Sequence, residues 1–402
     1  MTLRPLGRAS LLAVAFAPAL LGIGAQDGKK SGGAPAGTPG SLSLDEIRQM
    51  LSAPGANEPF VPEAPFGIHT ELATVIPATN PLTKVKVELG RQLYFDKRLS
   101  RDGSVSCASC HDPARGWTDH APVSTGIHGA KGNRSAPTVL NRVLGKTQFW
   151  DGRAASLEDQ ALGPMANPIE MGFTVDEAAG RLNEVPGYKL QFEKVFGGPA
   201  NGERIAMAIA AFERTVVVAA SPNDYWEDAM VYEGAPPDPD ETAEDKAFRE
   251  KRIAAAKAHP MSDSAKRGRA LFFGKAQCSL CHAGENFTDE QFHNIGIGME
   301  VPQPDLGRGK VSGKKDETGA FKTPTVRNVK DTGPYMHDGS LKTLREVIDH
   351  YDKGGVGAPR NPALSGKIHK LDLTEAEKKD LEAFLVDGLS GPAPKIDVPK
   401  LP

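Results

Sequence analysis

The sequence has few aromatic residues, little net charge and few alternating strand patterns. Aromatic side chains make up 6% of the 402 residues, whereas glycine (43) and proline (32) are plentiful. This composition favours a loop-rich fold packed around something other than its own side chains. The net charge of −3 argues against a nucleic-acid partner, because that polyanion favours a basic face. With strand patterns scarce, the fold class predicted is mainly α.

Long apolar runs are also missing. The longest one, residues 11–25, is shorter than the roughly 20 residues that a spanning helix needs, and Pro18 interrupts it. Arg4 and Arg8 precede it, and the small residues Gly22, Gly24 and Ala25 lie near its end, so residues 1–26 are predicted to be a signal peptide that is cleaved on export to a periplasmic compartment. Residues 27–42, rich in Gly, Pro, Ser and Lys, are predicted to be a disordered linker.

Only four cysteines are present, and an exported chain would normally use them in disulfides. Here they form two C-x-x-C-H pentapeptides, at 107–111 and 278–282. Covalent haem c needs two thiols one helical turn apart and an adjacent imidazole for the iron. A thioredoxin-like redox pair is disfavoured because no βαβ pattern surrounds either motif. Two haem c groups are therefore predicted, attached at Cys107, Cys110, Cys278 and Cys281, with His111 and His282 as axial ligands.

A repeat precedes the two haem motifs. GRQLYF at 90–95 resembles GRALFF at 268–273, and in each the apolar residues would share one helix face that packs against a porphyrin. We expect two cytochrome c-like helical haem domains, at 60–225 and 263–390. Residues 226–262, which include an acidic stretch with prolines, are predicted to be a linker or insertion.

Further helices are indicated by apolar periodicity and capping residues. A short helix is predicted over 44–51, with Ser43 as its N-cap. The other predicted helices cover 178–182, 202–219, 243–258, 341–351 and 374–386.

Several motifs between about residues 89 and 355 resemble those of the bacterial di-haem cytochrome c peroxidases and the related MauG enzymes. They are GRQLYFDKRLS, RSAPTVLN, FWDGR, EDQALGP, IEM, KTPTVRNV and TGPYMHDGS, in the order and spacing of that family. The resemblance implies that an N-terminal haem meets peroxide and that a C-terminal haem passes electrons to it.

The resemblance also implies a set of pocket residues. Glu170 in the IEM motif would be the general acid/base, because O–O cleavage needs one oxygen to lose a proton and the other to gain one. Gln160 and Pro164 would lie around the same pocket. Trp150 in FWDGR would relay electrons between the haems, although a Trp is more often a core residue.

The sixth ligand of the first haem separates the subtypes of the family. Activation-dependent peroxidases carry a capping His where this sequence has Ile127, which cannot bind iron, with His128 one residue further on. Either His128 caps the iron through a shifted loop, or the haem has an open face. The open face is the favoured interpretation.

At the second haem, Tyr351 stands where activation-dependent peroxidases carry a Met and MauG-like enzymes a Tyr. A phenolate would stabilise ferric iron and lower its potential. The predicted ligand opposite His282 is therefore Tyr351, with Met336 or His350 as the alternatives.

Between its haems the family binds Ca²⁺ through an Asn side chain and backbone carbonyls. The matching positions here are Ser135, Thr332 and Pro334. Ca²⁺ accepts six to eight oxygen ligands, so Ser is tolerable, and a Ca²⁺ ion is expected although Ser departs from the pattern.

Three functions follow from these residues. The favoured one is a periplasmic peroxidase that reduces hydrogen peroxide with electrons from a small cytochrome c or cupredoxin. The alternative is a MauG-like oxidase that forms a bis-ferryl state and modifies a partner protein. A plain electron-transfer cytochrome is disfavoured by Glu170 and the uncapped first haem. The sequence leaves open whether the chain forms a homodimer.

Overall fold

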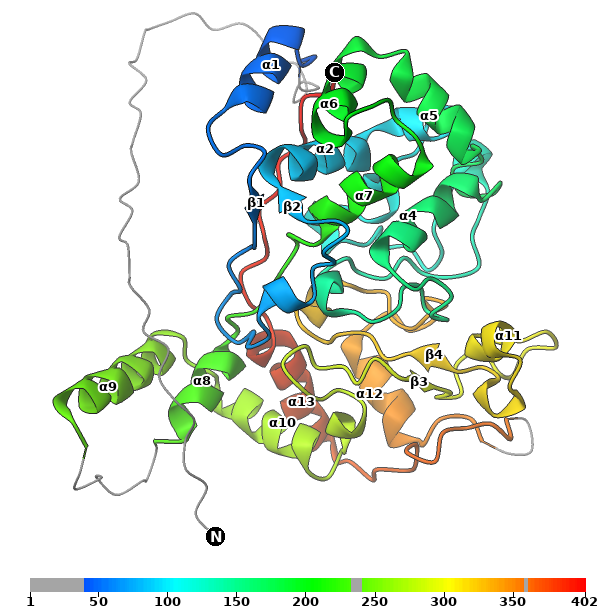
Figure 1. The fold of residues 1–402 in the computed structure, drawn as a ribbon. Coiled ribbons are helices and arrows are strands. Elements are labelled where there is room, and N and C mark those ends of the chain that lie inside the picture. The colour runs from blue at the N-terminus through cyan, green and yellow to red at the C-terminus, as the bar shows by residue number, and fades with distance from the viewer. Residues whose placement is uncertain (1–39, 233–240, 358–360) are drawn as a thin grey trace, which may run out of the picture. The chain divides into compact units, whose positions relative to one another are not determined.

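Helices joined by long loops dominate the computed structural model, which describes residues 40–232, 241–357 and 361–402 (Figure 1). The predicted mainly α, loop-rich fold is therefore confirmed. The helices are α1 (Leu44–Ser52), α2 (Lys84–Phe95), α3 (Cys107–Cys110), α4 (Leu157–Ala166), α5 (Val175–Asn183), α6 (Pro186–Phe196), α7 (Gly202–Glu213), α8 (Pro222–Met230), α9 (Ala243–Ala258), α10 (Asp263–Phe273), α11 (Arg308–Ser312), α12 (Leu344–Asp352) and α13 (Glu375–Ala383).

The strands are short. β1 (Pro59–Phe60) pairs antiparallel with β2 (Leu82–Thr83), and β3 (Phe292–His293) pairs antiparallel with β4 (Phe321–Lys322). No helix in the described ranges is long and apolar enough to cross a membrane. The predicted signal peptide, and the predicted linker up to residue 39, lie outside the described residues, as does the 233–240 part of the predicted insertion.

Local chemistry explains where the predicted helices begin and end. The helix predicted from residue 44 begins there because Ser43 and Glu46 form a capping box. The helix predicted over 202–219 ends at Glu213, because residues 215–218 (Thr-Val-Val-Val) are β-branched and favour extended backbone. Helices α4, α6 and α8 were not predicted. Each of them contains a proline, which α6 and α8 carry in the first turn, where it is tolerated.

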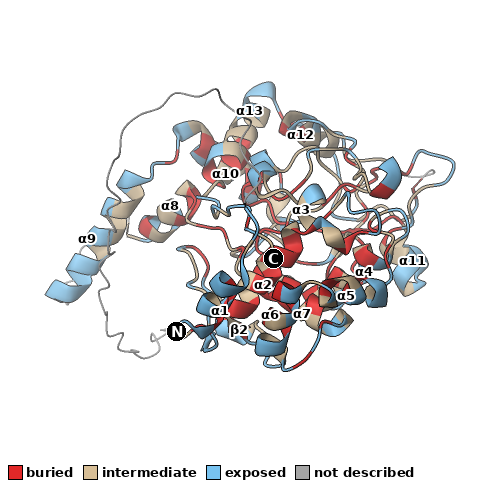
Figure 2. Cartoon of the chain, turned by 90° about the horizontal axis from the view of Figure 1, so that it is seen from above, coloured by how far each residue is buried: buried red, intermediate tan, exposed pale blue. Residues whose placement is uncertain are grey.

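Most helices pack around one of two large hydrophobic cores, and two smaller clusters lie beside them, one of them at α1. The first contains residues between Leu89 and Val218, and the second contains residues between Met261 and Leu389. We call residues 84–218 the first half and residues 261–391 the second half. Figure 2 shows buried residues concentrated along α2 and α7, whereas α9 in the predicted insertion has none. The division into haem domains at 60–225 and 263–390 stays a prediction.

The two halves repeat one helix packing. In the first half α2 packs on α7, and a Cβ atom on Gly90 would overlap the carbonyl oxygen of Ala208. In the second half α10 packs on α13, and a Cβ atom on Gly268 would overlap the carbonyl oxygen of Asp380. Both glycines come from the repeat that precedes the haem motifs. They allow each helix pair to approach at backbone distance.

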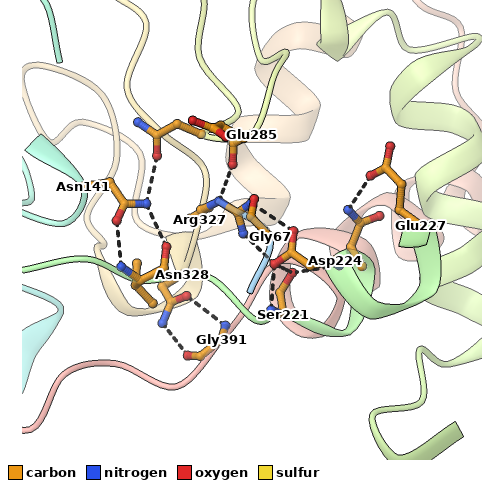
Figure 3. Close-up of polar contacts among 12 residues, drawn as sticks. Gly67, Asn141, Ser221, Asp224, Glu227, Glu285, Arg327, Asn328 and Gly391 are labelled. Carbon is orange, nitrogen blue, oxygen red and sulfur yellow. Dashed lines mark hydrogen bonds and ion pairs between the residues drawn. The ribbon is translucent and has the colours of Figure 1, made fainter. Parts of the chain in front are cut away.

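A second repeated feature is an asparagine that anchors the chain after the last helix of each half. The Asn141 side chain donates to the Val218 carbonyl (2.9 Å) and accepts from its N–H (2.7 Å). The Asn328 side chain makes the same pair of bonds with Gly391, both 2.9 Å long (Figure 3). Both asparagines have left-handed backbone, with φ of 58° and 52°. The halves therefore share one scaffold beyond the haem motifs.

A buried ion pair joins segments that are distant in sequence. The Arg327 guanidinium, 1% exposed, donates to both carboxylate oxygens of Asp224 at 2.8 and 2.9 Å (Figure 3). It also donates to the carbonyl oxygens of Glu285 (2.6 Å) and Gly67 (3.2 Å). A buried charge is tolerated only with such complete pairing. Arg327 thus fixes the second half against α8 and the segment before β2.

The C-terminal segment returns to the first half (Figure 1). Arg91 in α2 donates to the carbonyl oxygen of Asp397 (2.7 Å), and Arg98 donates to a terminal oxygen of Pro402 (2.9 Å). The N–H of Leu42, before α1, donates to the carbonyl oxygen of Leu401 (2.8 Å). The end of the chain therefore ties the second half to α1 and α2.

The glycine packing yields a stability prediction. We expect Gly268→Ala to destabilise the protein by about 1–3 kcal/mol, because the new methyl group must push α10 away from α13. Gly180→Ala, in α5, is the matched control, since no atom lies within 4 Å of its Cβ position. It should be neutral or stabilising by up to about 1 kcal/mol. Urea unfolding measures both, and equal midpoints for Gly268→Ala and the wild type would contradict the packing argument.

Candidate functional site

A single cavity of about 750 Å³ connects the two C-x-x-C-H motifs. This volume lies in the range of sites for large organic ligands. The residues lining it include the whole set predicted to attach and ligate haem: Cys107, Cys110, His111, Cys278, Cys281 and His282. The two predicted attachment sites therefore face a shared space.

The first motif forms a single helical turn. α3 spans Cys107–Cys110, which sets the two sulfurs one turn apart, and the N–H of His111 donates to the Cys107 carbonyl (2.9 Å). The carbonyl of His111 accepts from the hydroxyl of Tyr94 on α2 (2.8 Å). Burial lowers the pKa of His111, and its Nδ1 is buried without a hydrogen-bond partner. The ring is thus a neutral imidazole, the form that binds iron.

The second motif has the same geometry. Cys278 opens a single 3₁₀ turn, and the N–H of His282 donates to the Cys278 carbonyl (2.9 Å). Nδ1 of His282 lies 3.1 Å from the carbonyl oxygen of Phe287, which orients the ring and leaves Nε2 for a metal. Burial lowers the pKa of His282 as well. Both motifs therefore fit haem c in the same way.

The four cysteines form no disulfide with one another. Burial raises the pKa of all four, to about 11 for Cys110 and about 12 for Cys278. A reactive redox pair would instead carry a thiol with a lowered pKa. The surroundings therefore do not match a thioredoxin-like site.

Two buried cations also line the cavity, and sequence reasoning did not identify either of them. Arg142 donates to Glu290 at 3.0 Å, and Nζ of Lys322 lies 3.7 Å from the same carboxylate. The pKa of Lys322 is lowered to about 7, mainly by burial and also by the positive charge of Arg142, while Glu290 opposes the fall. With two cations and one carboxylate, this part of the wall suits the anionic propionates of a haem.

Glu170 lies on the loop after α4 and lines the cavity. Its Oε1 accepts from the Asn167 side chain (2.7 Å), and its carbonyl accepts from the N–H of Ile127 (2.8 Å). Burial raises the pKa of the Glu170 carboxyl, while the Asn167 hydrogen bond and the charge of Arg153 oppose that rise. A carboxyl whose pKa is raised in this way holds a proton more readily than an exposed one, as a general acid/base requires.

His128 and Ile127 are placed differently. Ile127 is buried, 4% exposed, against the loop that carries Glu170. The His128 side chain is 72% exposed, its Nδ1 lies 3.6 Å from Asp102, and it is not among the described residues that line the cavity. This loop therefore directs its histidine toward solvent.

The duplicated scaffold relates Pro164 to Tyr351. α4 is capped by Ser156 and α12 by Thr343, and both helices line the cavity in their last turn. Pro164 lies eight residues after its cap (164 − 156 = 8), and Tyr351 also lies eight after its own (351 − 343 = 8). The position that holds a phenol at the second site holds a proline at the first, and proline has no donor atom for iron.

Gln160, one turn before Pro164, also lines the cavity. The two alternative ligands predicted for the second haem, Met336 and His350, are placed differently. Met336 lines the cavity, whereas Nε2 of His350 lies 2.9 Å from the carbonyl oxygen of Ile295 and is engaged there. Burial raises the pKa of Tyr351 well above its ordinary value, so its phenol stays neutral unless a cation binds.

Trp150 lies where the halves meet. Its indole Nε1 donates to the carbonyl oxygen of Ser135 (2.8 Å), and its own carbonyl accepts from the N–H of Lys322 (2.7 Å). Reciprocally, the carbonyl of His337 accepts from the N–H of Ser135 (2.8 Å). The second half therefore holds the FWDGR loop of the first, and the first half holds the PYMHDG loop of the second.

The three positions predicted for Ca²⁺, namely Ser135, Thr332 and Pro334, all line the cavity. The Thr332 hydroxyl donates to the carbonyl of Val329 (3.0 Å), and the Ser135 carbonyl accepts from Trp150. Within the described part of the chain, no donor is bonded to the carbonyls of Thr332 and Pro334. Carbonyl oxygens of this kind suit Ca²⁺.

Comparisons with known proteins agree with this geometry. The model of the family described as di-haem cytochrome c peroxidase matches residues 84–230. The methylamine utilization protein MauG of Methylorubrum extorquens is 41% identical over 330 residues, covering 81% of this chain and 84% of that protein. The cytochrome c551 peroxidase of Nitrosomonas europaea is 33% identical over 366 residues, covering 90% and 93%.

A solved structure gives the same result. The crystal structure of a MauG-like protein associated with microbial copper homeostasis is 33% identical, with a TM-score of 0.65, over 79% of this chain and 92% of that one. Its fold and the curated relatives point to the same assignment. This chain belongs to the di-haem cytochrome c peroxidase and MauG family, whose members carry haem c and act as oxidoreductases that use peroxide.

Proposed function

We propose that this chain is a periplasmic di-haem peroxidase that reduces hydrogen peroxide to water. One observation carries the proposal: a single cavity faces both C-x-x-C-H motifs, and a half-buried carboxyl, Glu170, lines it beside the first motif. The charge of Glu170 raises the pKa of Cys110, which places the carboxyl close to the first haem position. A carrier of electrons alone would need no acid/base there.

The chain's own residues divide the work as follows. Haem held at the first motif by Cys107, Cys110 and His111 would supply iron for the reduction of peroxide. Glu170 takes a proton from one peroxide oxygen and returns it to the other, so that water can leave. The Asn167 amide holds the carboxyl in place, and Gln160 offers a further polar group in the pocket.

The first haem position has an open face in this proposal. Pro164 stands where the second half has Tyr351, and His128 faces solvent beside Asp102. With no ligand from either residue, peroxide can reach the iron without prior activation. Tyr351 would be the sixth ligand of the second haem, with Met336 as the remaining alternative.

Electrons would enter at the second haem and pass to the first, with Trp150 between the halves as the relay. The donor would be a small redox protein, such as a cytochrome c or a cupredoxin. A Ca²⁺ ion at Ser135, Thr332 and Pro334 would stabilise the region between the haems. Residues 1–26 would direct export and be removed.

A second candidate is a MauG-like oxidase that acts on a partner protein. The observation that favours it is that Tyr351, a half-buried residue, lines the cavity together with the second motif, where it would be the sixth ligand of the second haem. An anionic phenolate stabilises oxidised iron more than a thioether does. Ligation does not by itself identify a substrate, so peroxide reduction is the broader proposal.

Substitution of Glu170 tests its catalytic role. We expect Glu170→Gln to retain both haems but to slow the reaction with hydrogen peroxide by at least about tenfold, as loss of a general acid/base does. The exposed Glu184→Gln is the control and should react at the wild-type rate. Stopped-flow absorbance gives the rate constants, and an unchanged constant would remove Glu170 from the mechanism.

The same reaction should depend on pH. Glu170 must be deprotonated to accept the first proton, so the rate should rise as pH rises through its raised pKa. Asn167→Ala removes a hydrogen bond that lowers this pKa, so it should move the rising limb to higher pH. In Glu170→Gln that limb should vanish. A limb that persists there would belong to another group.

The ligand of the second haem can be tested spectroscopically. We expect Tyr351→Phe to abolish the low-spin ferric signal of one haem in electron paramagnetic resonance, because the phenolate would be lost. Tyr335→Phe, at a half-buried tyrosine of the same half, is the control. If the signal survives in Tyr351→Phe and disappears in Met336→Leu, the ligand is Met336.

Mixing the fully ferric protein with hydrogen peroxide, without added reductant, separates the two functions. A rapid spectral change of both haems would mean that the first haem is open and that both sites share the oxidation, which favours the MauG-like function. A slow change that becomes fast only after the second haem is reduced would mean that the first haem is capped. The open-face interpretation would then be wrong.

A further inference from the structure

Glu213 is a buried carboxyl on the cavity wall that has no part in the proposed function. It is the last residue of α7, is 5% exposed and lines the cavity one turn after Ile209. Its Oε2 is buried without a hydrogen-bond partner. The charge of Glu213 raises the pKa of Cys107 and of Tyr94, so the carboxyl lies close to the first haem position.

The second half has an apolar residue at the position equivalent to Glu213. Ala208 in α7 and Asp380 in α13 meet the two equivalent glycines of α2 and α10. Five residues further on, Glu213 corresponds to Leu385 (208 + 5 and 380 + 5), and Leu385 also lines the cavity. An apolar side chain therefore satisfies the scaffold. Burying the Glu213 carboxyl, whose Oε2 has no hydrogen-bond partner, costs stability. The fold alone therefore does not explain why a carboxyl stands at this position.

The protein groups around Glu213 favour its neutral acid form. The pKa of Glu213 is raised to about 8: burial is the main cause, the charges of Arg214 and Arg142 oppose the rise, and the charge of Glu158 on α4 adds to it. Both arginines are already paired: Arg214 with Glu158 (2.6 and 2.8 Å) and Arg142 with Glu290.

The other elements packed against α7 bring no charge that offsets this burial. From α2 Tyr94 faces Glu213, and from α3 Cys107 does, and both are neutral because their own pKa values are raised. α5 turns its apolar residues, Ala178, Ala179 and Leu182, to the core. The protein charges that act on Glu213 are therefore those of Glu158, Arg214 and Arg142, to which a haem bound at the first motif would add its own.

We propose that Glu213 is a redox-linked proton site of the haem attached at Cys107 and Cys110. When one electron from the second haem reduces this haem from ferric to ferrous, the Glu213 carboxylate takes one proton from solvent. Oxidation by one electron releases that proton. The local charge stays constant in both directions, because a ferric centre favours the carboxylate and a ferrous centre favours the acid.

This inference goes beyond the proposed function, since it depends on haem attachment but on neither peroxide nor a protein substrate. The absorption of the denatured haemoprotein in pyridine establishes the attachment independently. Failure of the inference is therefore distinguishable from failure of the proposed peroxidase activity.

Spectroelectrochemical titration of the full-length holoprotein tests it. In the wild type we expect the midpoint potential of the first haem to fall as pH rises from about 6 to about 9, because deprotonation of Glu213 favours ferric iron. The slope should approach a tenfold change in the reduction equilibrium per pH unit. Glu213→Gln and Glu213→Leu should lose most of it, whereas Glu203→Gln, exposed on the same helix, should keep it.

A reciprocal variant in the second half tests the proposal without altering the first site, where a substitution could disturb folding. Leu385→Glu places a carboxyl at the equivalent position, and we expect it to give the second haem a new pH dependence while the first haem keeps its own. The proposal is overturned if Glu213→Leu retains the wild-type slope, or if Leu385→Glu retains both haems without changing the second potential's response to pH.

Discussion

The site depends above all on two reciprocal backbone hydrogen bonds. The N–H of Ser135 donates to His337 of the second half, and the N–H of Lys322 donates to Trp150 of the first half. Each of these bonds positions a loop that lines the cavity from the opposite half. Because backbone donors are fixed by the chain rather than by rotamers, the two motifs face each other in one register. The buried pair of Arg327 and Asp224 supports this register from behind the cavity, where a lost partner would leave a costly charge.

The two halves then differ at a few positions of one scaffold. Where the second half has Tyr351, the first has Pro164, so only the second site has a side chain at this position with a donor atom for a metal. Glu213 faces the cavity where the other half has Leu385. These substitutions leave the glycine contacts and asparagine anchors unchanged, since those features hold the backbone rather than the chemistry. A duplicated fold can thus carry two haems of unlike reactivity without two separate architectures.

The sequence predicts the features that depend on local spacing. The C-x-x-C-H pentapeptides and the helices predicted at 44–51 and 243–258 follow from chemistry within a few residues. The structure has both helices, the first one residue longer, and places both motifs on the cavity. Features that depend on distant contacts were missed. Glu213 ends an apolar helix, where a charged residue would normally meet solvent, and only the packing of α7 reveals its burial. The shared text PTVLN and PTVRN could have indicated the asparagine anchors, but its meaning lies in bonds to residues 218 and 391.

In this proposal, replacing Glu213 with leucine would suit the packing of the protein but would change its redox behaviour. A leucine there would improve packing and remove an unsatisfied oxygen, and the second half accepts that solution. With the carboxyl retained, the protein has a proton site whose protonation depends on the oxidation state of the haem at the first motif. Reduction of a buried haem without a compensating proton would leave uncompensated charge in a region of low dielectric constant. A carboxyl whose pKa is raised to about 8 meets that need near neutral pH, whereas an exposed carboxyl would already be ionised and would not respond.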